Sequence, residues 1–440
     1  MSNQMSISIN NRFFLQGGKP FFWLGDTAWL LFRKLDLDET KMYLENRAMK
    51  GFTVIQATLV HEAKTMNTVG SPALLGENFS TPNPDNSQGS FWWQVEQTIQ
   101  YASKLGLTMA LLPSWGSFYK EGKLNQDNVI VYADFLAERF SVYDNVIWLV
   151  GGDVRGSEAP DVFRLMGNRL REKCPEQLIG FHPFGRCSSS YWFHESEWLD
   201  FNMFQSGHRN YDQIKLNAWD DKVDVERWVG EDNYKYVQHD LSLHPTKPTL
   251  DGEPSYELIP QGLHDGNMPY WQASDVRRYA YWSLFSGSAG HTYGDNAIMQ
   301  FWSGNGKPAY SALHSWLTAL HNPGSMQMGH LRKLMELLPW HEAKPCQEVL
   351  LGNNGTKYDY NLAIGTFEKV MVYTHSGKPF AINPIHLPFE TLYLYWFDPV
   401  AGNYSYLGSR GIEDSLLFDP PKRLSEQSDW VLLLAKSRIT

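Results

Sequence analysis

Short apolar runs alternate with amphipathic stretches over the first three quarters of the chain. Brief apolar runs of this kind are typical of strands buried in a parallel sheet, and the stretches between them repeat apolar positions with helical spacing. The runs lie at residues 21–24, 53–57, 107–112, 146–150, 178–181, 201–205, 248–250 and 289–293.

The stretches between these runs predict helices, and the order of elements predicts the fold class. The predicted helices cover residues 37–51, 90–104, 126–139, 160–173 and 274–284, the first of them with Asp38 as its N-cap. Eight strands joined mostly by helices over roughly 250–300 residues favour an α/β fold, a (β/α)8 TIM barrel. An open doubly wound sheet is the alternative. It usually carries a glycine fingerprint after its first strand, which Gly25-Asp26-Thr27-Ala28 does not provide.

The pattern changes after about residue 340. Short β-rich runs, at 348–351, 370–374, 392–397 and 430–434, are separated by turn signals such as Asn353-Asn354-Gly355. We therefore predict a catalytic barrel over residues 1–340 and a small all-β, sandwich-like domain over residues 341–440.

Composition narrows the function. Of 440 residues, 42% are hydrophobic and 14% aromatic, and the formal net charge is -10. Because the sequence contains no cluster of basic residues, nucleic acid is not expected as a partner. No run approaches the ~18 apolar residues of a membrane span, and the polar first ten residues contain no signal peptide. The three cysteines have neither zinc nor disulfide-framework spacing, and no cofactor motif is present.

The residues at the predicted strand ends form the candidate site, because in a barrel these ends meet at one mouth. Nearly every end carries a polar or aromatic side chain. They are Asp26, His61 with Glu62, Trp115, Asp153, His182, Gln205 with His208, Asp251 with Glu253, and His291 with Tyr293. The long Pro- and Asn-rich loop over 71–89 is expected to form a wall of the site.

Two carboxylates have the placement that glycosidic cleavage needs. Asp153 follows a Gly-Gly pair at the fourth strand, and Glu253 follows the seventh strand, on the opposite side of the mouth. One acid protonates the leaving oxygen while the other attacks the anomeric carbon or activates water. Each has a structural alternative: Asp153 as a helix cap and Glu253 as a salt-bridged acid. Glu257 and Asp251 are the rivals for the nucleophile, and Glu62 for the acid.

Histidine and aromatic side chains complete the predicted sugar site. His61, His182 and His291 are interpreted as sugar-hydroxyl partners or as buried core residues, with neither reading favoured. Trp29, Trp115 and Trp302 are candidate stacking platforms for a sugar ring, although each alone fits a core position equally well or better. The expected partner is a carbohydrate.

Two further functions compete with a glycosidase. One is a carbohydrate-binding protein on an inactive hydrolase scaffold, against which the presence of both carboxylates counts. The other is a metal-dependent hydrolase using His61, His182, His208 and Asp251, although neither an HxH nor an HExxH motif occurs.

Several segments resemble the apiosidase-like bacterial proteins, glycoside hydrolase family 140. The resemblance rests on residues 17–29 with Gly25-Asp26-Thr27-Ala28-Trp29, on 47–57, on 148–153, and on Asp251-Gly252-Glu253-Pro254-Ser255-Tyr256-Glu257. It implies a (β/α)8 barrel with exo-action on apiose-containing side chains of pectin. It also implies Asp153 as general acid/base, Glu253 as nucleophile, and export from the cell. Tyr256 belongs to the same motif and is expected to bind substrate.

Overall fold

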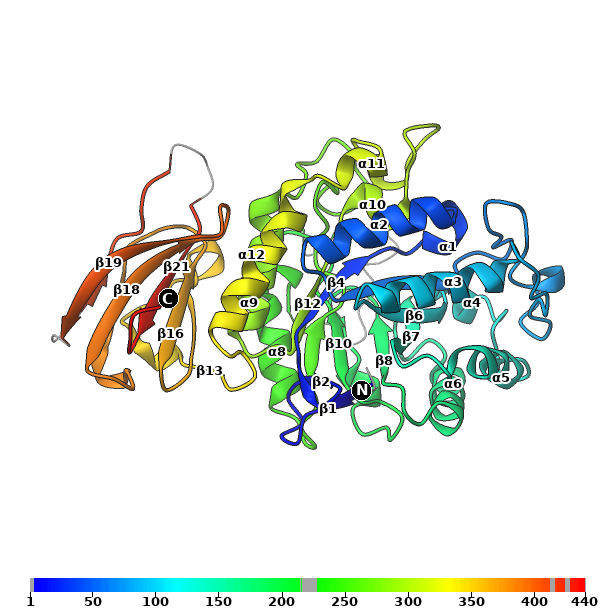
Figure 1. Ribbon diagram of the computed structural model, residues 1–440, viewed down its shortest axis with the longest axis horizontal. Coiled ribbons are helices and arrows are strands. Elements are labelled where there is room, and N and C mark those ends of the chain that lie inside the picture. Colours follow the sequence, from blue (N-terminus) through cyan, green and yellow to red (C-terminus); the bar gives the residue numbers. More distant parts are fainter. Residues whose placement is uncertain (1–3, 214, 216–227, 412–415, 424–427, 440) are drawn as a thin grey trace.

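The computed structural model describes residues 4–213, 215, 228–411, 416–423 and 428–439. Its larger part is a barrel of parallel strands surrounded by helices, and its smaller part is a β-domain formed by the C-terminal hundred residues (Figure 1). Within the described residues, no helix is long and apolar enough to cross a membrane.

Eight parallel strands form the barrel. They are β4 (Trp23–Thr27), β5 (Val54–Val60), β6 (Thr108–Ser114), β7 (Val146–Val154), β8 (Ile179–Pro183), β10 (Asn202–Gln205), β11 (Thr249–Asp251) and β12 (Gly290–Tyr293). The hydrogen-bonded order is β8-β7-β6-β5-β4-β12-β11-β10, with the short antiparallel β9 (Cys187–Ser188) beside β10. Asp200, just before β10, joins β8 through its backbone N–H to Ile179 O at 2.9 Å. The sheet is therefore nearly closed, as the strand pattern predicts.

Helices cover the outside of the barrel because their apolar faces need burial. The longer ones are α2 (Leu37–Met49), α3 (Phe91–Lys104), α5 (Val129–Phe140), α6 (Pro160–Lys173), α8 (Asn233–Leu241), α9 (Ala273–Phe285) and α12 (Pro323–Leu337). Short helices lie at the strand ends and in loops: α1 (Leu31–Lys34), α4 (Ser117–Lys120), α7 (Ser190–Phe193), α10 (Asn296–Gln300) and α11 (Trp316–Ala319). The N-cap of α2 is Asp36, whose carboxylate accepts from the backbone of Asp38 and Glu39. The prediction of Asp38 as the cap is therefore wrong.

An antiparallel sheet of β1 (Met5–Ile7), β2 (Phe14–Gln16) and β3 (Lys19–Phe21) precedes the barrel. Phe14 from this sheet is fully buried against Trp23 of β4 and Phe201, with ring centroids 5.5 and 5.3 Å away. Because a buried aromatic ring contributes a large apolar area, this sheet closes one end of the barrel core.

The β-domain is built from two antiparallel sheets. One has the order β13 (Lys344–Pro345), β15 (Leu362–Gly365), β16 (Lys369–Thr374), β21 (Trp430–Ala435), β18 (Thr391–Asp398), β19 (Asn403–Gly411). The other consists of β14 (Leu350–Leu351), β17 (Phe380–Ile382) and β20 (Leu416–Phe418). One face of the larger sheet and the inner face of the smaller one share an apolar core that includes Val372, Ile382 and Trp396. This arrangement is sandwich-like, as predicted.

The other face of the large sheet packs directly on the barrel. Side chains of α9 and of the sheet belong to one continuous apolar cluster, in which the rings of Tyr281 and Tyr373 stack at 4.4 Å. Arg277 and Asp429 form a fully buried ion pair beside it, with Nη2 and Oδ1 2.7 Å apart. In Figure 1, α9 and α12 lie between the barrel and the β-domain. The two parts therefore share a core, which is apolar apart from paired charges and hydrogen-bonded groups.

Candidate active site

A pocket of about 250 Å³ opens at the carboxyl ends of the barrel strands. Seven of the barrel strands are followed by at least one residue that lines it, and β7 contributes Asp153 from its own last turn. The predicted site residues in this lining are Trp29, His61, Trp115, Asp153, Gln205, His208, Glu253 and Tyr256. The topology thus brings together eight side chains that are up to 227 positions apart in the sequence. This is the convergence that a barrel mouth provides.

Asp153 stands on a strained turn at the end of β7. The ladder to β8 is interrupted between Gly151 and Val154, and the φ angles of Gly151, Gly152 and Asp153 are 95°, 109° and 52°. A Cβ atom on Gly151 would lie 2.7 Å from the carbonyl oxygen of His182, so a larger residue is excluded there. A positive φ on a non-glycine residue costs free energy and is concentrated at functional sites. This turn places the half-buried Asp153 on the pocket wall.

Glu253 is held from several sides. His208 Nε2 lies 3.1 Å from its Oε1, and His182 Nε2 lies 3.3 Å from its Oε2. The hydroxyl of Tyr256 also hydrogen-bonds this carboxylate and accepts from Trp29 Nε1 at 2.9 Å. Burial acts to raise the pKa of Glu253, but the hydrogen bond from His208 and the two histidine rings outweigh it, so the pKa is lowered. The side chain is therefore an ionised carboxylate, hydrogen-bonded by His208 at Oε1, whereas His182 lies near Oε2 without a well-aligned hydrogen bond.

His182 connects the two carboxylate residues. Its Nδ1 accepts a hydrogen bond from the backbone N–H of Asp153 at 3.3 Å, which leaves the ring proton on Nε2, facing Glu253. Burial lowers the pKa of His182, so the ring is neutral. The ring is fully buried behind the pocket wall and is not part of the lining. The structure therefore corrects the expectation of a sugar contact: His182 positions the groups that line the pocket.

Tyr310 lies near enough to both carboxylates for their charges to change its pKa. Burial and the negative charges of Asp153 and Glu253 together raise the pKa of this tyrosine to about 12. Its side chain lines the pocket from the loop after α10, and its φ of 48° is another strained backbone position. The strand-end pattern does not identify Tyr310, because this residue lies in the 3-10 turn η4 (Ala309–Ser311), well beyond the end of β12 at Tyr293.

Four predicted residues lie in the barrel interior. The Asp26 carboxylate is bound by Arg47 Nε at 2.6 Å and by the Tyr43 hydroxyl at 2.5 Å. Asp251 accepts from Ser206 Oγ at 2.6 Å, and burial raises the pKa of Asp251 to about 7. His291 is fully buried, which lowers its pKa to about 3, and Tyr293 donates to Glu257 Oε2 at 2.5 Å. The structure corrects the expectation that these side chains contact the sugar.

One predicted stacking residue, one predicted wall loop and one rival acid lie outside the pocket lining. Trp302 lies outside the pocket lining and donates from Nε1 to Asn305 O at 2.9 Å, so it is not a stacking platform in this pocket. The loop over 71–89 contributes no residue to the described lining, because Ala73, Leu74 and Phe79 turn into the core near α3. Glu62 pairs with Arg33 at 2.5 Å and is also outside the lining.

The stacking surface of the pocket is formed by Trp115 and Trp29. Their ring centroids are 5.4 Å apart, and the His61 ring lies 4.9 Å from Trp115 at an angle of 31°. Burial lowers the pKa of His61 to about 4, so this ring is neutral and presents a polar edge beside an apolar face. Such a pairing of aromatic face and polar edge suits a sugar ring.

Several lining residues were not predicted: Leu30, Phe184, Arg186, Arg209, His264 and Gln300 among others. Arg186 and Arg209 are nearly buried, at 6% and 5% exposure. Both lie within four residues of a strand end, so a wider window around each strand end would have included them. Among the described residues, no group of three His, Cys, Asp or Glu side chains is arranged to hold a metal ion.

A parallel barrel whose mouth presents two carboxylates is an arrangement that glycoside hydrolases use. Two solved structures agree with this class. One, described as "Glycoside hydrolase", is 36% identical with a TM-score of 0.92 and covers 99% of this chain and 97% of its own. The other, a glycoside hydrolase of family 5 from Bacteroides vulgatus, is 35% identical with a TM-score of 0.92, covering 98% and 93%.

The chain belongs to the apiosidase-like family. The family model described as "Apiosidase-like, catalytic domain" matches residues 8–342, which includes the whole barrel. A second model, described as "Putative collagen-binding domain of a collagenase", matches residues 345–435, the β-domain. No curated protein was found to be similar to the chain.

Proposed function

We propose that this glycoside hydrolase is an exo-acting enzyme of plant pectic side chains, apiosidase-like in its specificity, with Asp153 and Glu253 as its catalytic pair. The observation that carries the catalytic assignment is the hydrogen-bonded environment of Glu253, which keeps an acid with only 6% exposure ionised. Exo-action is supported by the pocket volume of about 250 Å³. That is below the roughly 300–1,000 Å³ of pockets that enclose larger ligands, and it suits a single terminal sugar.

The two carboxylates divide the reaction between them. Glu253 attacks the anomeric carbon while Asp153, in its protonated form, gives its proton to the leaving oxygen, and a glycosyl-enzyme ester forms. Asp153, now ionised, then takes a proton from a water molecule. The water oxygen bonds to the anomeric carbon, Glu253 leaves as a carboxylate, and Asp153 is protonated again.

The neighbouring side chains prepare Glu253 for this role. A nucleophile must be ionised and correctly aimed before the substrate arrives. His208 donates to one carboxylate oxygen and Tyr256 contributes a further hydrogen bond, so the charged form of Glu253 is stabilised. His182 accepts from the backbone N–H of Asp153 and its Nε2 lies 3.3 Å from the other oxygen of Glu253, so one ring lies against both residues.

The test is hydrolysis of pectic oligosaccharides that carry terminal apiose, comparing the wild type with Asp153→Asn and Glu253→Gln. We expect release of a monosaccharide by the wild type and loss of roughly 10⁴-fold or more in kcat in Glu253→Gln. Activity that survives Glu253→Gln would transfer the nucleophile to Glu257 or Asp251. A protein that binds these oligosaccharides and hydrolyses none would be a carbohydrate-binding scaffold.

A second measurement tests the double displacement. The anomer released first, followed by NMR, has the configuration of the substrate if Glu253 is the nucleophile, and the opposite configuration if it activates water. Azide is added to Asp153→Asn together with a substrate that carries a good leaving group. We expect azide to restore turnover and to form a glycosyl azide, because a small anion needs no general base. No azide product would argue against Asp153 as the acid/base.

A further inference from the structure

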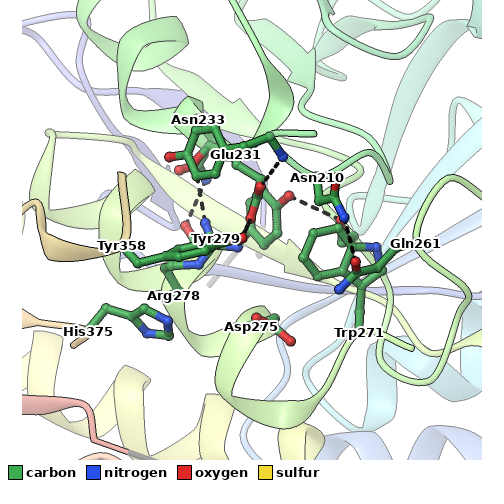
Figure 2. A network of polar contacts seen from close by, with 12 residues as sticks. Asn210, Glu231, Asn233, Gln261, Trp271, Asp275, Arg278, Tyr279, Tyr358 and His375 are labelled. Atoms are coloured by element: carbon green, nitrogen blue, oxygen red, sulfur yellow. Dashed lines mark hydrogen bonds and ion pairs between the residues drawn. The ribbon is translucent and has the colours of Figure 1, made fainter. Parts of the chain in front are cut away.

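One buried carboxylate joins three parts of the molecule. Glu231 lies in the 3-10 turn η3 (Gly230–Asp232) and is fully buried. Its Oε1 accepts from Arg278 Nη2 of α9 at 2.8 Å and from the Tyr358 hydroxyl of the β-domain at 2.8 Å. Its Oε2 accepts from the backbone N–H of Tyr211 at 2.5 Å. Figure 2 shows Glu231 and Arg278 in contact, with Tyr358 beside them. We call Glu231, Arg278 and Tyr358 the interdomain cluster.

Tyr211 belongs to the segment that positions the nucleophile. It lies three residues after His208, which donates to Glu253, and residues 207–209 of this segment line the pocket. The segment has little regular structure of its own, so its position depends on side-chain and loop contacts. The carboxylate of Glu231 is therefore a fixed point just behind the pocket wall.

The same segment also holds a neighbouring wall of the pocket. Asn210 Nδ2 donates to Gln261 Oε1 at 2.6 Å, and Gln213 Nε2 donates to the Gln261 carbonyl at 3.0 Å. Figure 2 shows Asn210 and Gln261 facing each other. Residues 259 and 262–264, on either side of Gln261, line the pocket. A shift of the segment would consequently displace two walls at once.

The β-domain contacts this segment through one short turn, η6 (Lys357–Asp359). Besides the hydroxyl contact with Glu231, the Tyr358 ring lies 5.3 Å from the Tyr211 ring, edge to face. The Lys357 ammonium lies 4.9 Å from the centroid of the Tyr211 ring, and the Arg278 guanidinium 5.1 Å from that of Tyr358. Two adjacent β-domain side chains thus contact one residue of the active-site segment.

We propose that the β-domain is a positioning part of the active site, acting through Tyr358 on Glu231 and through Tyr211 on His208. This inference rests on the proposed role of Glu253. The physical reason is the cost of a buried carboxylate that loses a donor. Without the Tyr358 hydroxyl, Glu231 keeps Arg278 and the Tyr211 N–H but is under-satisfied, and the segment that carries His208 is held less firmly.

The first experiment compares Tyr358→Phe with Tyr360→Phe in the full chain. Tyr360 is a matched control: it lies two residues away, and its hydroxyl accepts from Gln347 inside the β-domain. In Tyr358→Phe we expect kcat/KM to fall roughly three- to tenfold and the acidic limb of its pH profile to move to higher pH. The limb moves because Glu253 ionises less readily when His208 is misplaced. Tyr360→Phe is expected to leave both quantities as in the wild type.

A double-mutant cycle then asks whether Tyr358 acts through His208. In a His208→Phe background the effect of Tyr358→Phe on kcat/KM is expected to shrink to less than about twofold, because phenylalanine has no donor for Glu253 and the route is already broken. Full additivity of the two changes would overturn the proposed route.

Amide hydrogen exchange tests the same proposal without any substrate. We expect Tyr358→Phe, and not Tyr360→Phe, to speed exchange in peptides covering residues 206–213. Unchanged exchange and an unmoved pH profile, with only a lower Tm, would show that the β-domain is a buttress and would overturn the proposal. If Glu253→Gln remains active, the catalytic assignment fails, and the exchange result still decides whether Tyr358 holds the segment.

Discussion

Two glutamates four residues apart, Glu253 and Glu257, have opposite surroundings. Glu253 lines the pocket, is hydrogen-bonded by His208 and Tyr256, and has a lowered pKa. Glu257 accepts from the Tyr293 hydroxyl and from the Gly324 N–H, and burial together with the charge of Asp295 raises its pKa to about 7. The environment, and not the residue type, therefore separates an ionised carboxylate in the pocket from a buried acid outside it, which supports the proposed role of Glu253.

The difference follows from where each side chain points after β11. Glu253 turns toward the mouth, where His208 and Tyr256 hydrogen-bond to it. Glu257 turns toward the outer helices, where a Cβ atom on Gly324 of α12 would lie 2.3 Å from its Oε2. Its neighbour Asp295 caps α10 and is also raised in pKa, to about 6. Glu257 thus anchors the helices that follow the last strand, which are part of the support of the pocket.

Removing the charge of Glu253 and of Glu257 in turn tests this difference most directly. We expect Glu253→Gln to lose roughly 10⁴-fold or more in kcat, whereas Glu257→Gln stays within about tenfold of the wild type. Initial rates on the same pectic oligosaccharide measure both. A larger loss in Glu257→Gln than in Glu253→Gln would reverse the assignment.

The stability of the protein is expected to depend on pH through Glu257. Its pKa is about 7 in the folded state against an ordinary 4.5, so the folded state binds the proton more tightly. The contribution of Glu257 to the free energy of unfolding is therefore fully present below about pH 4.5. It is lost as the pH rises through about 7, and the loss is roughly 3 kcal/mol. Asp251 and Asp295 add changes of the same sign.

Urea unfolding at pH 5 and pH 8 measures this effect. Glu257→Gln mimics the protonated acid, so it is expected to lose less stability between the two pH values than the wild type. Glu253→Gln is the matched control and is expected to retain the pH dependence that Glu257 causes. Equal pH dependence in Glu257→Gln and the wild type would show that Glu257 is not the titrating group.

The smallest effect is expected from the donor to Glu253. His208→Phe is expected to raise the acidic limb of the kcat/KM profile by about one pH unit, because a phenyl ring has no donor and Glu253 loses a hydrogen bond that favours its charged form. The exposed His314 provides the control variant His314→Phe. An unmoved limb would mean that the lowered pKa of Glu253 has another source.

Much of the fold could be predicted from local patterns. Each predicted strand overlaps an observed barrel strand, and the helix at 160–173 has the observed bounds of α6, because apolar periodicity reflects burial directly. The cap of α2 was placed two residues late, since Asp36 and Asp38 are both suitable and only the hydrogen bonds distinguish them.

The candidate site could be predicted only in part. By itself, the sequence determined which residues stand at the strand ends, because parallel strands place those ends at one mouth whatever the details. The tertiary structure decided which of them enter the pocket: Glu253 does, while Asp251, two residues earlier, binds Ser206 in the interior. It also brought Tyr310 beside both carboxylates and Tyr358 of the β-domain onto Glu231. Side-chain direction and burial depend on contacts between segments far apart in the chain, which no local pattern contains.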